Sequence, residues 1–196
     1  MVSIELGPVT GEDSVVDNQR LRRAYGRFPT GVTALCALDG GMPVGLAASS
    51  FNTVSADPPL VSVALQLGST TWPKLVESPR IGVSVFADDQ GQLARQMAGH
   101  GDRFAGVGTT AAESGAVFLD GAAAWYEVTL DEVHRIGDHD VAILRVARHG
   151  VDEAKRPLVF GDSRFQRGVE LVPPRTEPEP DPYFLDSVHE LELGWY

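Results

Sequence analysis

The chain has 196 residues, 43% of them hydrophobic and 22% charged, which is enough to bury one sizeable core. Its net charge is -11 with a pI of about 4.8, and it has no basic stripe, which argues against nucleic acid as a partner. We expect no membrane partner and a cytoplasmic location, because neither a membrane-length apolar run nor a secretory signal is apparent. The single cysteine, Cys36, excludes an internal disulfide and a cysteine-cluster metal site.

A helix is predicted after an irregular N-terminal arm at 1–16. Asp17 can cap this helix, and Pro29 ends it because proline disfavours helical geometry at the preceding residue. Apolar side chains recur in it at helical spacing, at Leu21, Ala24, Tyr25 and Phe28. Arginines occupy its other faces, at positions 20, 22, 23 and 27. We interpret them as a solvated face, with a ligand clamp as the alternative.

From Thr30 onward the pattern is mainly that of β-strands. Strands are predicted over 32–38, 44–48, 60–67, 81–86, 117–119, 125–133, 141–148 and 158–160. Short helices are predicted after the hydroxyl cluster at 69–71 and after Asp88. Because helices do not alternate regularly with strands, a doubly wound parallel sheet is disfavoured. The pattern favours a mainly β fold, a closed or nearly closed antiparallel barrel with peripheral helices.

The stretch 43–59 combines small residues with hydroxyls. An apolar run stops at Ala48, serines and threonines follow, and Pro58 and Pro59 precede the next strand. Small residues let a ligand approach the main chain, and hydroxyls and N–H groups can donate to phosphate or to ring carbonyls. The alternative is a polar loop between two strands. The helix start near Ser69 and the compact loop containing Arg103 are further candidates for contact with an anion.

The composition changes at residue 170. Prolines and acidic residues dominate 170–182, while the last residues include Leu191, Leu193, Trp195 and Tyr196. We predict a central domain at 17–169 and an acidic, proline-rich extension at 170–196. The extension is interpreted as solvated, with an apolar end that packs on the body or on a partner chain.

No nucleotide or metal motif is present, and no metal site is expected. The five histidines have no metal-like spacing, and there is no G-x-S-x-G or P-loop pattern. His139 lies in a polar turn, where turn chemistry and a functional role are equally good explanations. The lack of acid–base pairs indicates chemistry that a bound cofactor performs while the protein positions it.

Five stretches follow one another along the chain in a recognisable order: 23–33, 43–61, 69–73, 102–106 and 137–139. In their order and in their residues they resemble the motifs of the short-chain flavin reductase family, the reductase partners of two-component flavin-dependent monooxygenases. The resemblance covers about residues 20–168. It implies an FMN-binding type of split β-barrel, a homodimer, and hydride transfer from NADH or NADPH to FMN or FAD. The reduced flavin would then leave to serve a monooxygenase component.

The resemblance also implies a set of flavin-binding positions, most of them in loops or at the ends of strands: Thr30, Gly31, Ala47, Ala48, Ser49, Ser50, Ser55, Asp57, Pro58, Ser69, Thr70, Thr71, Arg103 and Phe104. Arg103 and Phe104 would close over the phosphate end. His139 would be the catalytic residue, near the nicotinamide or the flavin ring. On this basis Ser50→Ala and Arg103→Ala are expected mainly to weaken flavin binding.

One position departs from the family pattern. Ser49 stands where the family usually has asparagine, so an amide that could contact the ring is lost. Two other functions stay open. One is a flavoprotein that holds its flavin tightly and acts on another substrate. The other is a non-enzymatic subunit that carries flavin or docks a partner.

Overall fold

The computed structural model describes residues 14–167. The predicted extension at 170–196 and most of the predicted arm at 1–16 lie outside this range. Helix α1 (Ser14–Tyr25) contains Asp17, so the prediction that Asp17 caps the start of this helix was wrong. No glycine or proline separates Ser14 from Asp17, and the helix therefore extends back past it.

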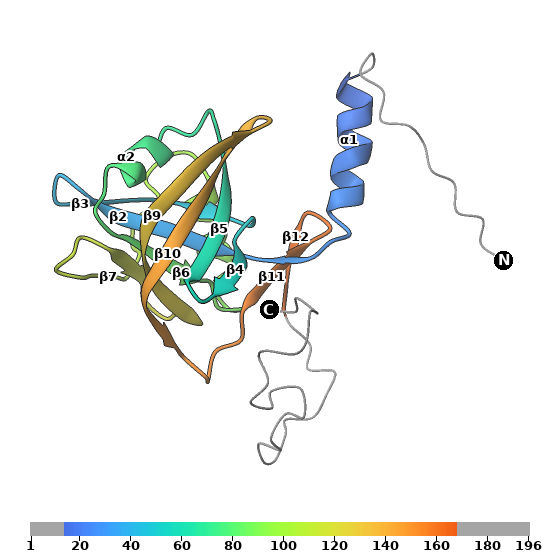
Figure 1. Cartoon of the computed structure of the whole chain (residues 1–196). Coiled ribbons are helices and arrows are strands. Elements are labelled where there is room, and N and C mark those ends of the chain that lie inside the picture. The colour runs from blue at the N-terminus through green and yellow to red at the C-terminus, as the bar shows by residue number, and fades with distance from the viewer. Residues whose placement is uncertain (1–13, 168–196) are drawn as a thin grey trace, which may run out of the picture.

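A seven-stranded antiparallel sheet forms the body of the molecule (Figure 1). Its strands are, in spatial order, β3 (Met42–Ala48), β2 (Thr33–Asp39), β6 (Ile81–Val85), β9 (Ala124–Ile136), β10 (His139–Val151), β5 (Pro59–Gln66) and β4 (Asn52–Ala56). The edge strands β3 and β4 do not pair with each other, so the sheet curls into a barrel that stays open. The predicted antiparallel, mainly β architecture is confirmed.

Smaller elements complete the described part of the chain. Strands β1 (Thr30–Gly31), β11 (Leu158–Gly161) and β12 (Arg164–Arg167) form one small sheet. Strands β7 (Thr109–Ala111) and β8 (Val117–Leu119) form another. The two further helices are α2 (Trp72–Val76) and α3 (Gly91–Ala98).

Strand β4 was not predicted. It lies inside the stretch 43–59, in the part after Ala48 for which no strand was predicted. Residues Asn52–Ala56 instead pair antiparallel with β5 through a turn at Asp57 and Pro58. Thr53 and Val54 are β-branched, which suits an edge strand with solvent on one side.

Strand β2 is buried on both faces over most of its length, which explains the apolar run at 34–38. Leu35 and Ala37 face the first core, inside the barrel, together with residues of β5, β6, β9 and β10. Ala34 and Cys36 face a second core, which includes side chains of α3, β8 and β11. The two cores thus contact β2 from opposite sides. Full burial of a leucine-sized side chain contributes about 1.5–3 kcal/mol to folding stability.

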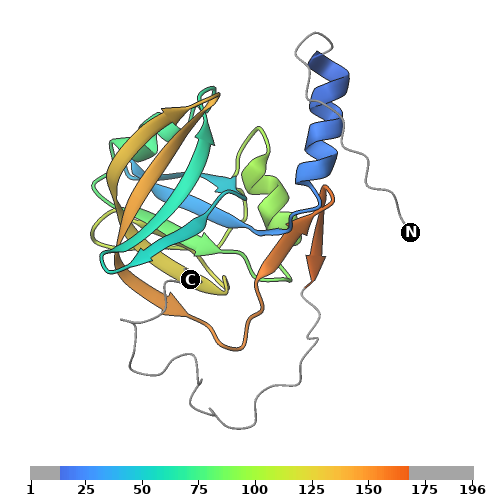
Figure 2. The same cartoon turned by 45° about the vertical axis from the view of Figure 1, so that its right-hand side comes forward.

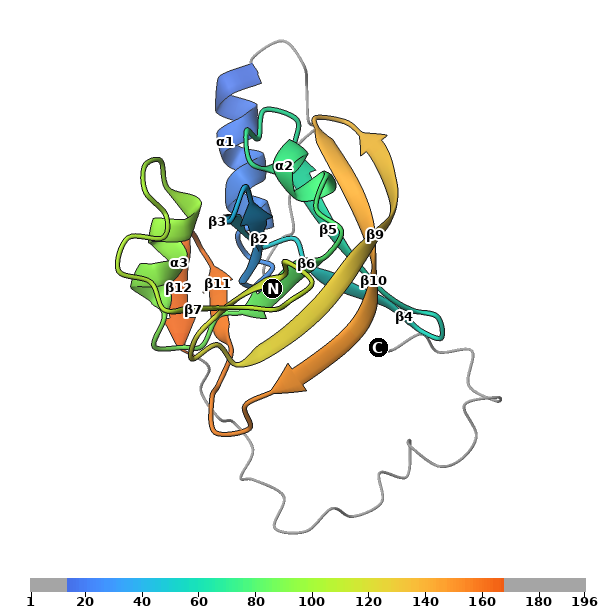
Figure 3. The same cartoon turned by 90° about the vertical axis from the view of Figure 1, so that its left-hand side faces the viewer.

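Helices α1 and α3 and the β11–β12 hairpin lie outside the seven-stranded sheet. Helix α1 leads away from the barrel, while α3 lies beside β11 and β12 in both turned views (Figures 2 and 3). Within residues 14–167, no helix is both long and apolar enough to span a membrane.

Candidate functional site

A cavity of about 530 Å³ lies between the C-terminal end of α1, the segment after β3 and the β11–β12 turn. Its walls include the rings of Tyr25, Phe28 and Phe160. Three predicted flavin-binding residues, Thr30, Ser49 and Ser50, also line it. The cavity therefore combines flat apolar surfaces with hydroxyl groups, which suits a planar ring that carries polar atoms at its edge.

Backbone pairing positions these hydroxyls. Thr30 pairs with Phe160, and Gly31 with Val159, where β1 meets β11. The Ser50 hydroxyl donates to the Ala64 carbonyl at 2.8 Å and accepts from the Ala64 N–H at 3.1 Å. The Ser50 O–H therefore already donates to β5. Through these two hydrogen bonds the Ser50 side chain attaches the segment after β3 to the sheet.

A second cavity, of about 410 Å³, lies at the other end of β3. It brings together four predicted residues, Thr70, Thr71, Arg103 and Phe104. Lys74 and His100, which sequence reasoning missed, add two basic side chains to its lining, and Asp102 adds an acidic one. Lys74 also pairs with Asp39 at 2.9 Å. Basic groups and hydroxyls around one hollow are the donor set that a phosphate requires.

Arg103 holds this second cavity together. Its Nε donates to the Gly99 carbonyl at 2.9 Å, and its Nη1 donates to the Gly45 carbonyl and to the Thr71 hydroxyl, both at 2.9 Å. Phe104 packs against the second core and approaches Gly45 so closely that a Cβ there would lie 3.1 Å from its ring. Arg103 and Phe104 therefore stabilise the fold around the cavity and also line it, where a ligand could contact them.

The start of α2 differs from the predicted helix cap. Thr71 is the N-cap but its side chain makes no capping hydrogen bond. The Ser69 hydroxyl instead accepts from the Trp72 N–H at 3.1 Å. Because α2 is only five residues long, its N-terminus adds little to anion binding, and the side chains of the cavity carry that role.

The two cavities lie toward opposite ends of β3. Residues 43–45 line one and residues 49 and 50 line the other. At about 3.3 Å per residue, Gly45 and Ser49 are roughly 13 Å apart along the chain. Ala47 and Ala48 lie between them, half-buried and buried respectively, and neither they nor Gly31 line either of these two cavities.

Four predicted site residues lie apart from both cavities. Ser55 pairs with Leu60, and Asp57 and Pro58 form the turn at the far end of the β4–β5 hairpin. Measured along the chain, an extended segment from Ser50 to that turn is roughly 20 Å long. His139 lies at the tip of the β9–β10 hairpin, with its Nδ1 at 2.7 Å from Asp138 Oδ1.

The hairpin tip is electrostatically linked to α1. The hydrogen bond with His139 lowers the pKa of Asp138, and the charges of His139 and of Arg22 on α1 lower it further. Arg22 also lines the larger cavity. Arg22 is thus available to a ligand in the larger cavity, while Arg20 and Arg23 are exposed to solvent.

Sequence reasoning missed the aromatic wall of the larger cavity. Tyr25 and Phe28 were assigned to the apolar face of a helix, yet they are 67% and 75% exposed. Their position shortly before Thr30 and Gly31, two of the expected flavin-binding residues, could have indicated that they lie near the site. Phe160 was predicted only as a strand residue, and Ser163 was not singled out.

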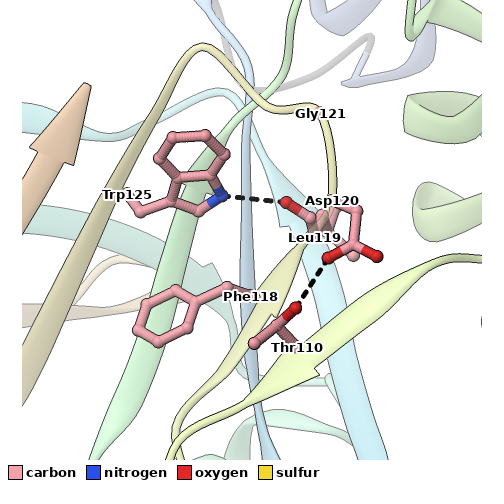
Figure 4. A pocket seen from close by; sticks show the side chains of 6 residues that line it. All are labelled: Thr110, Phe118, Leu119, Asp120, Gly121 and Trp125. Atoms are coloured by element: carbon pink, nitrogen blue, oxygen red, sulfur yellow. Dashed lines mark hydrogen bonds between the residues drawn. The ribbon is translucent and has the colours of Figure 1, made fainter. Parts of the chain in front are cut away.

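A third cavity, of about 310 Å³, lies where β7 and β8 meet β9 (Figure 4). Trp125 donates from Nε1 to the Leu119 carbonyl at 2.8 Å, and Thr110 donates to Asp120 Oδ1 at 2.9 Å. No predicted site residue lines it. Among residues 14–167, no group of three or more histidine, cysteine, aspartate or glutamate side chains is arranged to hold a metal ion.

Comparison with known proteins identifies the family. A family model described as "Flavin reductase like domain" matches residues 25–168. The reductase subunit HsaB of a flavin-dependent monooxygenase from Rhodococcus jostii is 36% identical over 180 residues, covering 89% of this chain and 91% of that protein. A Streptomyces coelicolor protein named actinorhodin polyketide dimerase is 38% identical over 151 residues, covering 76% of this chain and 85% of that protein.

Solved structures that resemble this chain include flavin reductases as well. The NADH:FAD oxidoreductase SgcE6 of Streptomyces globisporus, solved in complex with NAD and FAD fragments, superposes with a TM-score of 0.76 at 32% identity. The match covers 85% of this chain and 99% of that one. With a family match over most of the chain and relatives above 30% identity, the chain belongs to the flavin reductase-like domain family.

Proposed function

We propose that the protein is an NAD(P)H-dependent flavin reductase that binds FMN or FAD as a substrate and releases it reduced. One observation supports the proposal: an aromatic, hydroxyl-lined cavity lies just past the C-terminal end of β3, and a hydroxyl-lined cavity with basic side chains lies along its N-terminal half. A flavin has a planar ring at one end and a phosphate at the other. The proposed orientation puts the ring beside Thr30, Ser49 and Ser50, and the phosphate beside Thr71, Lys74 and Arg103.

The residues of the site fit the chemistry. Hydride transfer between two stacked rings is promoted mainly by proximity and orientation, which rigid walls provide. Hydroxyl and N–H donors at the edge of the ring stabilise the negative charge that develops on the flavin. No side chain has to transfer a proton in this step, which agrees with the lack of an acid–base pair in the larger cavity.

We further propose a homodimer in the cytoplasm that supplies reduced flavin to a monooxygenase component. Tyr25 and Phe28 are large, apolar and mostly exposed, and a second copy could cover them. The monooxygenase partner is suggested by relatives such as HsaB, which is named as a reductase subunit. Light scattering of the purified chain tests the dimer.

The test of the main proposal is NADH and NADPH oxidation by the purified protein, with and without FMN, FAD or riboflavin. Consumption that requires added flavin and saturates with it would establish flavin as a substrate. Flavin binding without turnover of either nicotinamide would refute the reductase and leave a carrier subunit. No flavin binding at all would limit the likeness to the fold.

A second candidate is a flavoprotein that keeps its flavin and acts on an organic substrate. The relative named actinorhodin polyketide dimerase favours this possibility, because its name describes a different reaction on a similar chain. Flavin that copurifies with the protein and survives dialysis, with no stimulation by added flavin, would support this candidate over the diffusible-flavin reductase.

A further inference from the structure

The loop between α3 and β7 forms one wall of the 410 Å³ cavity. Five consecutive residues of this loop line the cavity: His100, Gly101, Asp102, Arg103 and Phe104. In the part of the chain that the structure describes, no helix or strand includes any of residues 99–108. Hydrogen bonds of a helix or a sheet therefore do not fix the shape of this loop, and other contacts must hold its backbone.

A glutamine of the preceding helix supplies two of these contacts. The Nε2 atom of Gln96, on α3, donates to the Arg103 carbonyl at 3.2 Å and to the Ala105 carbonyl at 3.0 Å. The amide NH₂ group has two hydrogens, so each carbonyl can accept one of them. Both partners are acceptors, which the amide oxygen of Gln96 could not satisfy. A single side chain thus holds the loop backbone on both sides of Phe104.

Helix α3 is a firm base for Gln96. Ala94 and Met97 of this helix are fully buried in the second core. The loop adds a hydrogen bond of its own, since Asp102 Oδ1 accepts from the Phe104 N–H at 3.0 Å. Through Gln96, the backbone at 103–105 is therefore held in a fixed position relative to the core.

The position of the Arg103 backbone decides where the guanidinium of Arg103 can reach. Its Nη1 donates to the Gly45 carbonyl on β3 and to the Thr71 hydroxyl, both at 2.9 Å. Both partners also line the 410 Å³ cavity. Gln96 is not among the residues that line it, so Gln96 would act through Arg103 and not on a ligand directly.

We propose that Gln96 is a positioning residue for phosphate binding, and that it sets how strongly the protein prefers a phosphorylated flavin to the unphosphorylated ring. The proposal rests on the proposed function, which places the flavin phosphate beside Arg103. A binding group works only when its supporting residues hold it within about 0.5 Å of the required position. Loss of the two Gln96 hydrogen bonds therefore weakens the phosphate contact. The ring site, toward the other end of β3, is left unchanged.

FMN and riboflavin differ only in the phosphate, so the ratio of their dissociation constants isolates its contribution. The two constants are measured by quenching of flavin fluorescence with the full chain, as wild type, Gln96→Met and Gln96→Glu. Methionine keeps the length of the side chain without N–H donors, and glutamate places a further acceptor opposite the two carbonyls. Gln92→Glu is the matched control, because Gln92 is exposed one turn earlier on α3 and gains the same charge. Thermal melting checks that each variant folds.

We expect the wild type to bind FMN more tightly than riboflavin. In Gln96→Met the FMN constant should rise about tenfold, as for loss of one charge-assisted hydrogen bond, while the riboflavin constant stays unchanged. Gln96→Glu should lose at least as much affinity for FMN, and Gln92→Glu should keep the wild-type ratio. A wild-type ratio in both Gln96 variants would overturn the proposal. An equal rise for both ligands, which general damage to the fold would give, or the same loss in Gln92→Glu would overturn it as well.

A double variant tests whether Gln96 acts through Arg103. If it does, Gln96→Met should change the FMN constant by about twofold at most once Arg103→Ala is present. The full effect of Gln96→Met in that background would contradict the proposal. If Arg103→Ala does not fold, the single variants decide.

The same measurements distinguish failure of this role from failure of the proposed function. A wild type that reduces added flavin and prefers FMN, while both Gln96 variants keep that preference, refutes only the role of Gln96. A wild type that oxidises neither nicotinamide refutes the reductase, and the binding ratios still judge Gln96. Equal wild-type affinity for FMN and riboflavin refutes the phosphate position and the role of Gln96 together, and NADH oxidation then judges the reductase separately.

Discussion

Arg103 donates a hydrogen bond of 2.9 Å to the hydroxyl of Thr71, across 32 positions of sequence. The bond joins the loop after α3 to the start of α2 at the wall of the basic cavity. It shows that a residue expected to contact a phosphate also holds together the wall that would receive it.

Arg103→Ala is therefore expected to reduce both stability and flavin affinity. It removes the Arg103 donor from the Gly45 and Gly99 carbonyls, whose hydrogen bonds are part-buried, and an unsatisfied buried group costs about 1–3 kcal/mol. We expect the free energy of unfolding, measured with urea, to fall by about 2–3 kcal/mol. Thr71→Val is the control because it removes one of the three acceptors. A variant that melts like the wild type but binds flavin poorly would show that Arg103 acts on the ligand alone.

Ser50→Ala is expected to act mainly on stability. The hydroxyl donates to the Ala64 carbonyl and accepts from the Ala64 N–H, so its removal leaves both backbone groups unpaired. The expected loss is about 1–2 kcal/mol in the free energy of unfolding, with a smaller effect on flavin affinity. Ser49→Ala, at an exposed neighbouring position, should leave stability within about 0.5 kcal/mol. Unchanged stability with lost flavin binding in Ser50→Ala would restore the role implied by the family resemblance.

Much of the fold follows from local sequence patterns. The run 32–38 was recognisable as a strand because it is apolar except for Thr33, and its burial between two cores explains why apolar and polar residues do not alternate in it. Strands β1, β4, β7 and β12 were not predicted. Each is short, between two and five residues, and each depends on a partner that the sequence does not reveal, such as β11 for Thr30 and Gly31.

The site was harder to predict than the fold. Arg103 and Thr71 meet only because loops from distant parts of the chain converge, and the resemblance to a family, rather than spacing, pointed to both. The stretch 43–59 was treated as one site, but β4 carries Asp57 and Pro58 away from Ser49 and Ser50. Tyr25 and Phe28 looked like core residues because helical periodicity cannot tell a buried face from one that lines a cavity.

Gly82→Ala is expected to be strongly destabilising. A Cβ at Gly82 would clash with the backbone of Val117, where β6 and β8 approach most closely. Backbone cannot yield as a flexible side chain does, so we expect a loss of about 3 kcal/mol or more in the free energy of unfolding. Gly68→Ala is the control, since nothing lies within 4 Å of a Cβ built there. Equal melting temperatures for the two variants would contradict this close approach.

Cys36 is expected to be inert in the folded protein. Burial raises the pKa of its thiol from 9.0 to about 12. A thiol reagent at pH 8 should therefore label the native protein only as fast as it unfolds, and should label it at once in denaturant. Rapid labelling of the native protein would show that the second core opens locally.

The raised pKa of Cys36 also has a consequence for stability. The folded state favours the neutral thiol, so this contribution is fully present below pH 9.0 and is lost as the pH rises toward 12. Cys36→Ala should reduce the decline of stability across that window, compared with the wild type. An identical decline in both proteins would mean that other groups account for it.

His139→Asn tests the one residue that the family resemblance makes catalytic. His139 lines neither cavity and pairs with Asp138 at the exposed hairpin tip, so its replacement should leave stability and flavin affinity unchanged. If it only orients the nicotinamide, turnover of NADH should fall by less than the roughly 100-fold that loss of a general acid or base costs at minimum. Asp138→Asn is the control, because it keeps the imidazole and removes its partner. A larger loss in His139→Asn would assign His139 a proton-transfer role, and full activity would remove it from the site.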